Sequence, residues 1–134
     1  MILNISEAAN LGIHAAAYLA RCPADVPVTT ASIAAVFGVS AAHLSKVFQR
    51  LSKAGIVKSV RGPHGGFRLS RDPGQITLRE IYEALDGPLA PAGCLLSRPT
   101  CGLERCVLGT LLSEVTERVS THLSGTTLAD VLAR

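Results

Sequence analysis

The sequence contains no tryptophan, and aromatic residues make up only 4% of a chain of 134 residues that is 48% hydrophobic. Any core must therefore be aliphatic, which favours a mainly helical, single-domain protein built on Leu, Ala and Val. No apolar run approaches the roughly 18 residues that a membrane-spanning helix needs. No Lys or Arg precedes Arg21, so the basic start of a signal peptide is missing. We therefore expect a cytoplasmic protein without a membrane partner.

Acidic residues are missing between Asp25 and Asp72. That interval holds seven of the thirteen Lys and Arg residues, although the net charge of the whole chain is only +3. A basic interval in an otherwise acidic chain is typical of a nucleic-acid binder. A solvated surface is the alternative, but such surfaces are usually mixed in sign. A protein-interaction module would not need seven basic residues without opposing charge.

Signatures of an enzyme are also missing. The sequence has no nucleophile–base pattern, and the glycine-rich stretch from Gly62 to Gly66 lacks the Lys-Ser/Thr ending of a phosphate-binding loop. We therefore expect no catalytic activity.

Residues 59–69 predict two short strands joined by a tight basic turn, because alternating apolar residues flank a cluster of Gly and Pro. Arg61 and Arg68 lie on either side of the tip. Gly65 and Gly66 leave the backbone bare of side chains there. Such a hairpin fits against a phosphate backbone or into a minor groove. An ordinary surface hairpin is the alternative.

The interval before the hairpin predicts a short helix over residues 30–37, a turn at Gly38-Val39-Ser40, and an amphipathic basic helix over 41–53 that Ser40 caps. Helix, turn, basic helix and basic hairpin is the order of a winged helix-turn-helix, whose second helix enters the major groove by its N-terminal end. A structural helical hairpin is the alternative. The expected DNA contacts are Ser40, His43, Ser45, Lys46, Arg50, Arg61, His64, Gly65 and Gly66.

The C-terminal half predicts a helix beginning at residues 76–78, a Pro/Ala/Gly hinge over 87–93, and a long helix from about 100–103 to 123. A short capped helix follows over 126–133. The long helix carries an apolar stripe that a domain of this size is not expected to leave in water. Pairing with a second copy would bury the stripe, so we expect a homodimer.

Three of the four cysteines, Cys94, Cys101 and Cys106, lie within thirteen residues of one another. A disulfide framework is unexpected in a chain without a secretory signal. Thiolates at this spacing suit a soft metal or an iron–sulfur cluster, whereas zinc usually favours closer cysteine pairs. Thiols without a metal, either buried or redox-active, are the alternative. Cys22 stands apart, at a predicted helix end.

A cluster normally has four ligands, so the three cysteines leave one to be supplied. The candidates are His14 on a helix predicted over residues 6–20, Asn10, Glu7 and Glu104, from the same chain or from a second copy. A small molecule is a further candidate.

The chain resembles the Rrf-type bacterial winged-helix transcription regulators, a family that includes IscR, NsrR and CymR. The resemblance rests on Leu51-x3-Gly55-Ile56-Val57-x-Ser59-Val60-Arg61-Gly62-Pro63-x-Gly65-Gly66-Phe67-x-Leu69, then Ile76-x-Leu78-x2-Ile81 and the three cysteines. It covers nearly the whole chain. It implies a homodimer, crossed through the long C-terminal helices, that binds a roughly palindromic operator in double-stranded DNA.

The resemblance also implies site residues. In the cluster-bearing members, three cysteines of this segment hold a [2Fe–2S] or [4Fe–4S] cluster, although the usual middle position corresponds to Thr100 here. His14 falls where one branch of the family uses a histidine ligand. The wing arginine is retained as Arg61, whereas the base-reading positions of IscR are occupied by Ala42 and Ser45. Such a cluster can be absent from a sample purified in air.

The expected architecture is mainly α with a small β wing. It divides into a winged helix-turn-helix DNA-binding domain over residues 1–86, a cysteine-bearing loop over 87–106, and a dimerisation helix with a C-terminal segment over 107–134. The expected function is a transcription repressor that senses redox state, iron–sulfur status or nitric oxide through a cluster on three cysteines. The alternative is the same DNA-binding regulator without a cluster, switched by thiol oxidation or by a small-molecule effector.

Overall fold

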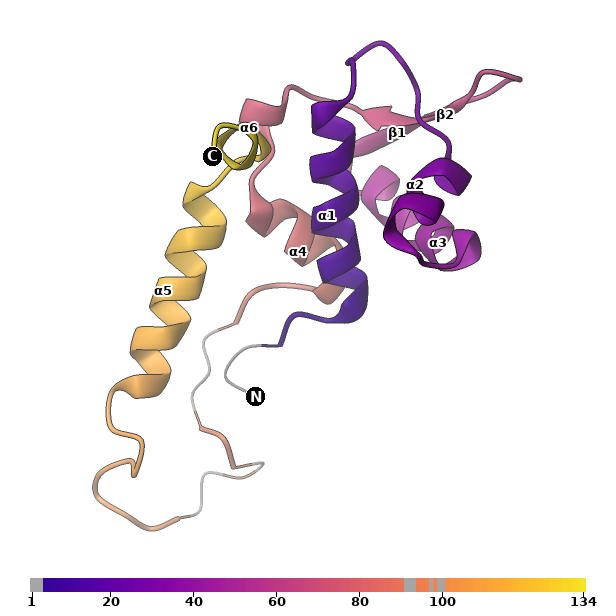
Figure 1. The fold of residues 1–134 in the computed structure, drawn as a ribbon. Helices are drawn as coiled ribbons and strands as arrows, with labels where there is room; N and C mark the ends of the chain where they lie inside the picture. The colour runs from indigo at the N-terminus through magenta and orange to yellow at the C-terminus, as the bar shows by residue number, and fades with distance from the viewer. Residues whose placement is uncertain (1–3, 91–93, 97, 99–100) are drawn as a thin grey trace.

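The computed structural model describes residues 4–90, 94–96, 98 and 101–134. Its elements, in chain order, are α1 (Glu7–Arg21), α2 (Thr30–Phe37), α3 (Ala41–Lys53), β1 (Val57–Val60), β2 (Gly66–Leu69), a 3₁₀ helix (Pro73–Gln75), α4 (Leu78–Asp86), α5 (Leu111–Gly125) and α6 (Leu128–Leu132). The predicted mainly helical fold with a two-stranded wing is confirmed (Figure 1). No single helix of the described residues is long and apolar enough to span a membrane; α2 and α3 reach that composition only as a pair bent by 118°.

Hydroxyl side chains begin the helices of the N-terminal half where the sequence predicts them. The Ser6 hydroxyl accepts a hydrogen bond from the backbone N–H of Ala9, and the Ser40 hydroxyl accepts one from His43. Between α2 and α3, Gly38 adopts a left-handed conformation with φ of 66°, which ends α2 and turns the chain. The predicted helix–turn–helix is therefore confirmed within one residue at each boundary.

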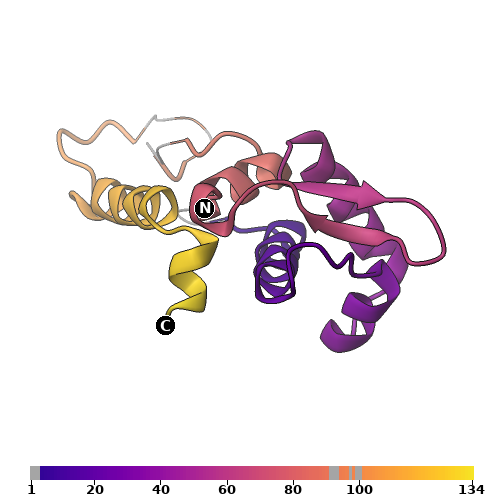
Figure 2. The ribbon, with the colours of Figure 1, turned by 90° about the horizontal axis from the view of Figure 1, so that it is seen from above.

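The wing is joined to α3 through an aromatic contact. Phe48 on α3 is fully buried and stacks on Phe67 of β2, with ring centroids 4.6 Å apart and an angle of 12° between the rings. Strands β1 and β2 pair antiparallel, with Val57 opposite Leu69 and Val60 opposite Gly66. Figures 1 and 2 both show α2, α3 and the hairpin on the same side of the molecule, away from α5. The core thus fixes the wing beside α3.

Two glycines of the wing are required by contacts within the chain. Val28 adds a bridge to the edge of the hairpin, because its N–H and C=O exchange hydrogen bonds of 2.9 and 2.8 Å with Phe67. A β-carbon on Gly66 would lie 2.4 Å from the Val28 carbonyl oxygen, and one on Gly65 would lie 2.1 Å from the Val60 carbonyl oxygen. The close approach of two backbone segments therefore accounts for both glycines.

Helix α4 packs closely on α1. A β-carbon on Gly12 of α1 would lie only 2.2 Å from a terminal methyl of Leu85, which is 3% exposed. Four of the nine residues of α4 are buried: Leu78, Ile81, Tyr82 and Leu85. The absence of a side chain at Gly12 thus allows the last turn of α4 to approach the α1 backbone.

The expected start of the long C-terminal helix is wrong. Helix α5 begins at Leu111, whereas the apolar stripe predicted a start at residues 100–103. Gly102 and Gly109 have positive φ angles of 67° and 58°, and a left-handed residue interrupts a right-handed helix. The apolar spacing continued through these glycines, so periodicity alone overestimated the helix. Residue 100 and part of the expected hinge, residues 91–93, lie outside the described residues.

We predict that Gly66→Ala lowers the free energy of unfolding, measured by urea denaturation, by about 1–3 kcal/mol. The new methyl would meet the Val28 backbone, and φ at this residue is 153°, which L-amino acids with side chains rarely adopt. Gly125→Ala is the control, because nothing lies within 4 Å of its β-carbon position. Equal stabilities of the two variants would contradict the close approach of the two backbones.

Candidate nucleic-acid interface and cysteine-bearing loop

Helix α3 has one buried face and one basic face. Its buried side chains are Leu44, Val47, Phe48 and Leu51. Lys46 lies on the exposed face, and Arg61 is exposed on the wing. Neither side chain has a hydrogen-bond or ion-pair partner in the part of the chain that the structure describes. Two cations without protein partners are thus presented on the side of the molecule formed by α3 and the hairpin.

The other predicted contacts at the start of α3 have different surroundings. The Ser40 hydroxyl accepts the 3.0 Å hydrogen bond from the His43 N–H and so serves as the helix cap. Ser45 is half-buried. The Nε2 atom of His43 is buried and has no hydrogen-bond partner among the described residues. On the wing, His64 is exposed, whereas Gly65 and Gly66 are half-buried.

Arg50, another expected DNA contact, differs from Lys46 and Arg61. Its guanidinium Nη2 donates a hydrogen bond of 2.5 Å to the Leu85 carbonyl oxygen at the end of α4. This contact joins two residues that are 35 positions apart in the sequence. The side chain therefore bridges α3 and α4, an arrangement that the spacing of charges along α3 did not predict.

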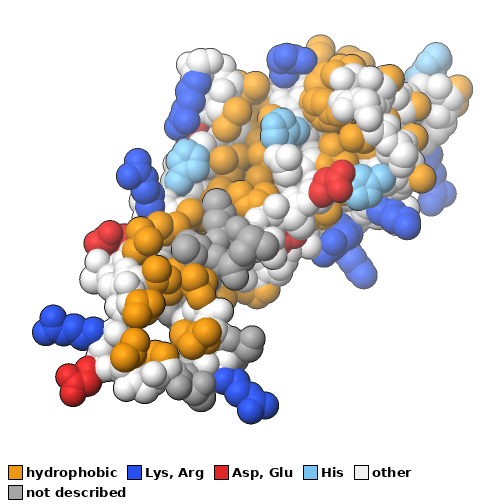
Figure 3. All heavy atoms as spheres, turned by 60° about the horizontal axis from the view of Figure 1, so that its bottom comes forward, with side chains coloured by type: hydrophobic (Ala, Val, Ile, Leu, Met, Phe, Trp, Pro, Cys, Tyr) orange, Lys and Arg blue, Asp and Glu red, His pale blue; other side chains and the backbone are white. Residues whose placement is uncertain are grey.

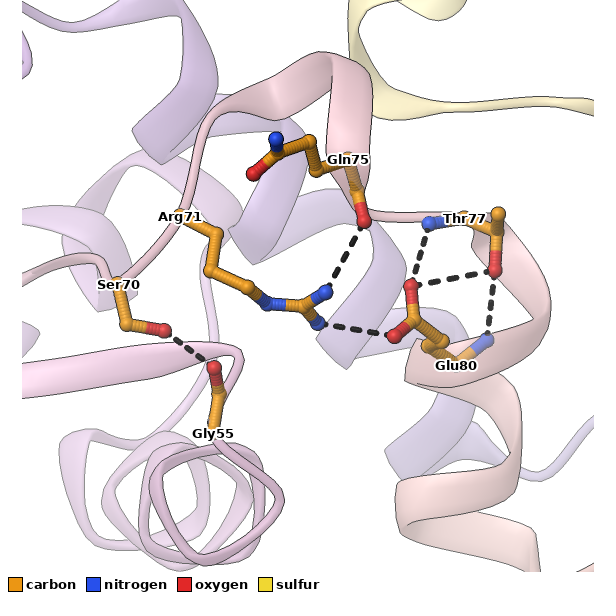
Figure 4. Close-up of polar contacts among 6 residues, drawn as sticks. All are labelled: Gly55, Ser70, Arg71, Gln75, Thr77 and Glu80. Atoms are coloured by element: carbon orange, nitrogen blue, oxygen red, sulfur yellow. Dashed lines mark hydrogen bonds and ion pairs between the residues drawn. The ribbon is translucent and has the colours of Figure 1, made fainter.

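Arg71, which follows the wing, is also engaged within the protein. It donates a 3.0 Å hydrogen bond to the Gln75 carbonyl oxygen and forms a 2.9 Å ion pair with Glu80 (Figure 4). Burial raises the pKa of Glu80, but hydrogen bonds from Thr77 and Arg71 outweigh it, so the pKa of this carboxyl lies below its usual value. The same figure shows the Ser70 hydroxyl donating to the Gly55 carbonyl oxygen. These contacts fix the chain where it leaves the wing and enters α4.

A second ion pair on α4 holds the entry to the cysteine-bearing loop. The carboxylate Oε1 of Glu83 accepts hydrogen bonds from the Leu89 N–H at 3.1 Å and from Arg79 Nε at 2.9 Å. Arg79 also donates to the Ser124 hydroxyl of α5 at 3.1 Å. The hydrogen bonds from Leu89 and Arg79 hold the pKa of Glu83 below its usual value. Sequence reasoning missed this cluster, although an Arg and a Glu four positions apart on a helix were a visible signal.

The structure does not bring the expected cluster ligands together. Cys94, Cys101 and Cys106 are exposed free thiols, and Cys22 is half-buried. No group of three His, Cys, Asp or Glu residues able to hold a metal occurs among residues 4–90, 94–96, 98 and 101–134. The Nδ1 atom of His14 lies 2.7 Å from the Asn10 carbonyl oxygen of its own helix. The donor chemistry of three thiols still fits a soft metal, but the structure gives such a site no geometry.

Large apolar side chains are exposed around this loop. Leu103, Val107 and Leu111 are 58%, 82% and 47% exposed. This end of the molecule comes forward in Figure 3, where hydrophobic side chains gather on the surface. An apolar surface next to free thiols is a candidate contact surface.

Comparison with known proteins identifies the family. The model of the Rrf2 family, described as iron-dependent transcriptional regulators, matches residues 5–134. The chain belongs to the Rrf2 family. This membership places it among transcription regulators and not among enzymes, as the sequence predicted.

Individual relatives agree with this assignment. The transcriptional regulator IscR of Yersinia enterocolitica is 36% identical over 108 residues, which are 81% of this chain and 66% of that protein, just under two thirds of its length. The structure of CymR, described as the global cysteine regulator of B. subtilis, superposes with a TM-score of 0.82 at 30% identity, covering 98% of this chain and 97% of that one. T. potens IscR gives a TM-score of 0.75 at 32% identity, covering 98% and 87%. The Rrf2 winged fold is therefore shared over nearly the whole chain.

We predict that Glu83→Gln makes the stability of the fold less sensitive to acid. A carboxyl whose pKa is lowered on folding stabilises the protein above its unfolded pKa, and this contribution is lost as the pH falls through the lower, folded pKa. Glutamine keeps the shape but does not titrate, so the variant should lose less stability than the wild type below about pH 4.3. Urea unfolding across this range measures the difference. Arg79→Gln removes one of the two donors to Glu83, so its loss of stability in acid should lie between those of the wild type and Glu83→Gln. An acid sensitivity equal to that of the wild type in both variants would contradict the stabilising role of these two hydrogen bonds.

Proposed function

We propose that this Rrf2-family chain is a repressor that reads a double-stranded DNA operator with α3 and the wing. The observation that carries the proposal is the placement of Lys46 on α3 and Arg61 on the wing, both exposed and without a hydrogen-bond or ion-pair partner among the described residues. Helix α3 and the hairpin lie on the same side of the molecule (Figure 2). No acidic residue interrupts the sequence between Asp25 and Asp72, so this side attracts a polyanion.

In the proposed complex, the N-terminal end of α3 enters the major groove. Ser40, His43 and Ser45 then approach the bases, and Lys46 binds phosphate. On the wing, Arg61 enters the minor groove beside His64, with the Gly65-Gly66 turn close to the DNA backbone.

We propose that two copies assemble through α5 and the cysteine-bearing loop. The exposed Leu103, Val107 and Leu111 support this, because a second copy would remove their apolar surface from water. Two DNA-binding heads held in this way would read a roughly palindromic operator, with half-sites about one helical turn apart.

The proposed signal is redox state, iron–sulfur status or nitric oxide, received at the cysteine-bearing loop. Cys94, Cys101 and Cys106 would hold an iron–sulfur cluster, [2Fe–2S] or [4Fe–4S], with His14 as the candidate fourth ligand. When bound, such a cluster supplies a centre that responds to oxidants and to nitric oxide. Similarity to IscR proteins and the description of the family as iron-dependent support this form of the proposal.

A second form of sensing needs no cluster. The three cysteines are exposed as free thiols. The chain also superposes over 98% of its length on CymR, described as the global cysteine regulator of B. subtilis. Oxidation of these thiols, or a small-molecule effector, would then switch the same DNA-binding head.

We predict that Arg61→Ala weakens binding to DNA by about 1–3 kcal/mol. The probe is a labelled duplex that the wild-type protein selects from a random-sequence pool, and fluorescence anisotropy measures the affinity. Arg134→Ala is the control, because the C-terminus lies away from the hairpin (Figure 1). Equal affinities of the two variants would contradict the role of the wing.

We predict that protein purified without oxygen carries iron and sulfide and shows broad visible absorption bands. Replacing Cys94, Cys101 or Cys106 by Ala should remove both the iron and the bands, because each thiolate is a proposed ligand. Cys22→Ala is the matched control and should keep both. A colourless, iron-free wild type that cannot be reconstituted would reject the cluster and favour the thiol switch.

A further inference from the structure

The end of α4 leaves one backbone pair unmade. In a continuing helix the N–H of Leu89 would bond the carbonyl oxygen of Leu85. Here Gly87 has a φ of 83° and turns the chain away, so that the last helical hydrogen bond is from the Gly87 N–H to the Glu83 carbonyl oxygen, at 3.1 Å. Leu89 and Leu85 are therefore separated at the point where the cysteine-bearing loop begins.

Side chains satisfy both halves of this broken pair. Glu83 accepts the Leu89 N–H at 3.1 Å, and Arg50 donates to the Leu85 carbonyl oxygen at 2.5 Å. A guanidinium suits this position, because the free carbonyls at a helix C-terminus carry partial negative charge. One partner leads into the loop and the other lies on the recognition helix α3.

The two side-chain contacts depend on the same backbone geometry. Extension of α4 toward Leu89 is disfavoured, because Pro88 has no N–H to bond the Ala84 carbonyl oxygen and its ring would crowd that carbonyl. A movement of the loop that opens the last turn of α4 displaces the Leu85 carbonyl, so that Arg50 loses its partner. Such a movement therefore changes the contact that joins α3 to α4.

We propose that Arg50 is a positioning residue that links the orientation of α3 to the start of the cysteine-bearing loop, and that Glu83 fixes the start of that loop. Arg50 acts through the Leu85 carbonyl and not through a DNA phosphate. The coupling to the loop rests on the proposed function, whereas the role of Arg50 in holding α3 does not.

Salt dependence separates positioning from phosphate binding. We would titrate the selected, labelled duplex with Arg50→Gln and with Lys46→Gln across a series of KCl concentrations. If Lys46 binds one phosphate, Lys46→Gln should reduce the magnitude of the slope of log affinity against log salt by about 1. Arg50→Gln should leave the slope at the wild-type value while lowering affinity at every salt concentration by about tenfold, as expected from losing one hydrogen bond to a charged group. A slope reduced as in Lys46→Gln would overturn the proposal.

Thiol modification tests the coupling. In a Cys22→Ser background, the loop cysteines are alkylated with iodoacetamide, and the ratio of DNA affinities before and after alkylation is measured. This ratio should fall to near one in Arg50→Gln and in Glu83→Gln. It should keep the wild-type value in Glu80→Gln, the matched control, whose carboxylate also pairs with an arginine at 2.9 Å but faces the wing end of α4.

The remaining outcomes are also decisive. A ratio in Arg50→Gln equal to that of the wild type would overturn the coupling. A wild-type ratio near one would instead reject the proposed sensing role of the loop, and the salt slopes would still decide between a positioning and a phosphate-binding Arg50. Arg50→Lys keeps one charged donor and should retain part of the wild-type ratio, which excludes misfolding as the cause of the loss in Arg50→Gln.

Discussion

The last turn of α4 is held by contacts that meet at Leu85 and its neighbours. The Leu85 side chain is buried against Gly12 of α1 and leaves no room for a β-carbon at that residue. The Leu85 carbonyl oxygen accepts a hydrogen bond from Arg50 on α3. The next residue, Asp86, accepts hydrogen bonds from the N–H and the hydroxyl of Ser6, the cap of α1. Three helices therefore meet before the chain enters the cysteine-bearing loop. Under the proposed function, a displacement of that loop would act on α1 and α3 through these contacts.

The polar contacts on α4 matter more for geometry than for stability. The pairs Arg71–Glu80 and Arg79–Glu83 are each about one third exposed or more, and exposed ion pairs typically contribute only about 0–1 kcal/mol. Their placement is informative: Glu80 holds the exit of the wing, and Glu83 holds the entry of the cysteine-bearing loop. One short helix thus bonds to both segments that the proposed function connects.

Whereas α4 is fixed by hydrogen bonds and ion pairs, the cysteine-bearing loop exposes its side chains. Its thiols are exposed, and Val107 beside it is 82% exposed. Apolar side chains in water are unfavourable, so a second copy covering them would stabilise both the loop and the assembly. The proposed cluster, thiol switch and dimer therefore involve the same surface. In the proposed dimer, a change at the cysteines would alter the position of both DNA-binding heads.

Local chemistry in the sequence determined most of the fold. Ser6 and Ser40 marked helix starts, Gly38 marked the turn, and the glycine-rich stretch marked the wing, because caps and left-handed residues act over only a few positions. Periodicity failed before α5, where Gly109 interrupts an apolar spacing that otherwise continues. Only the tertiary structure decided that Arg50 faces a carbonyl of α4, because that contact joins residues 35 positions apart and leaves no periodic signal. The same limit applies to the cysteines: the sequence places three thiols within thirteen residues, whereas the structure of one chain leaves them exposed and, among the described residues, forms no group able to hold a metal.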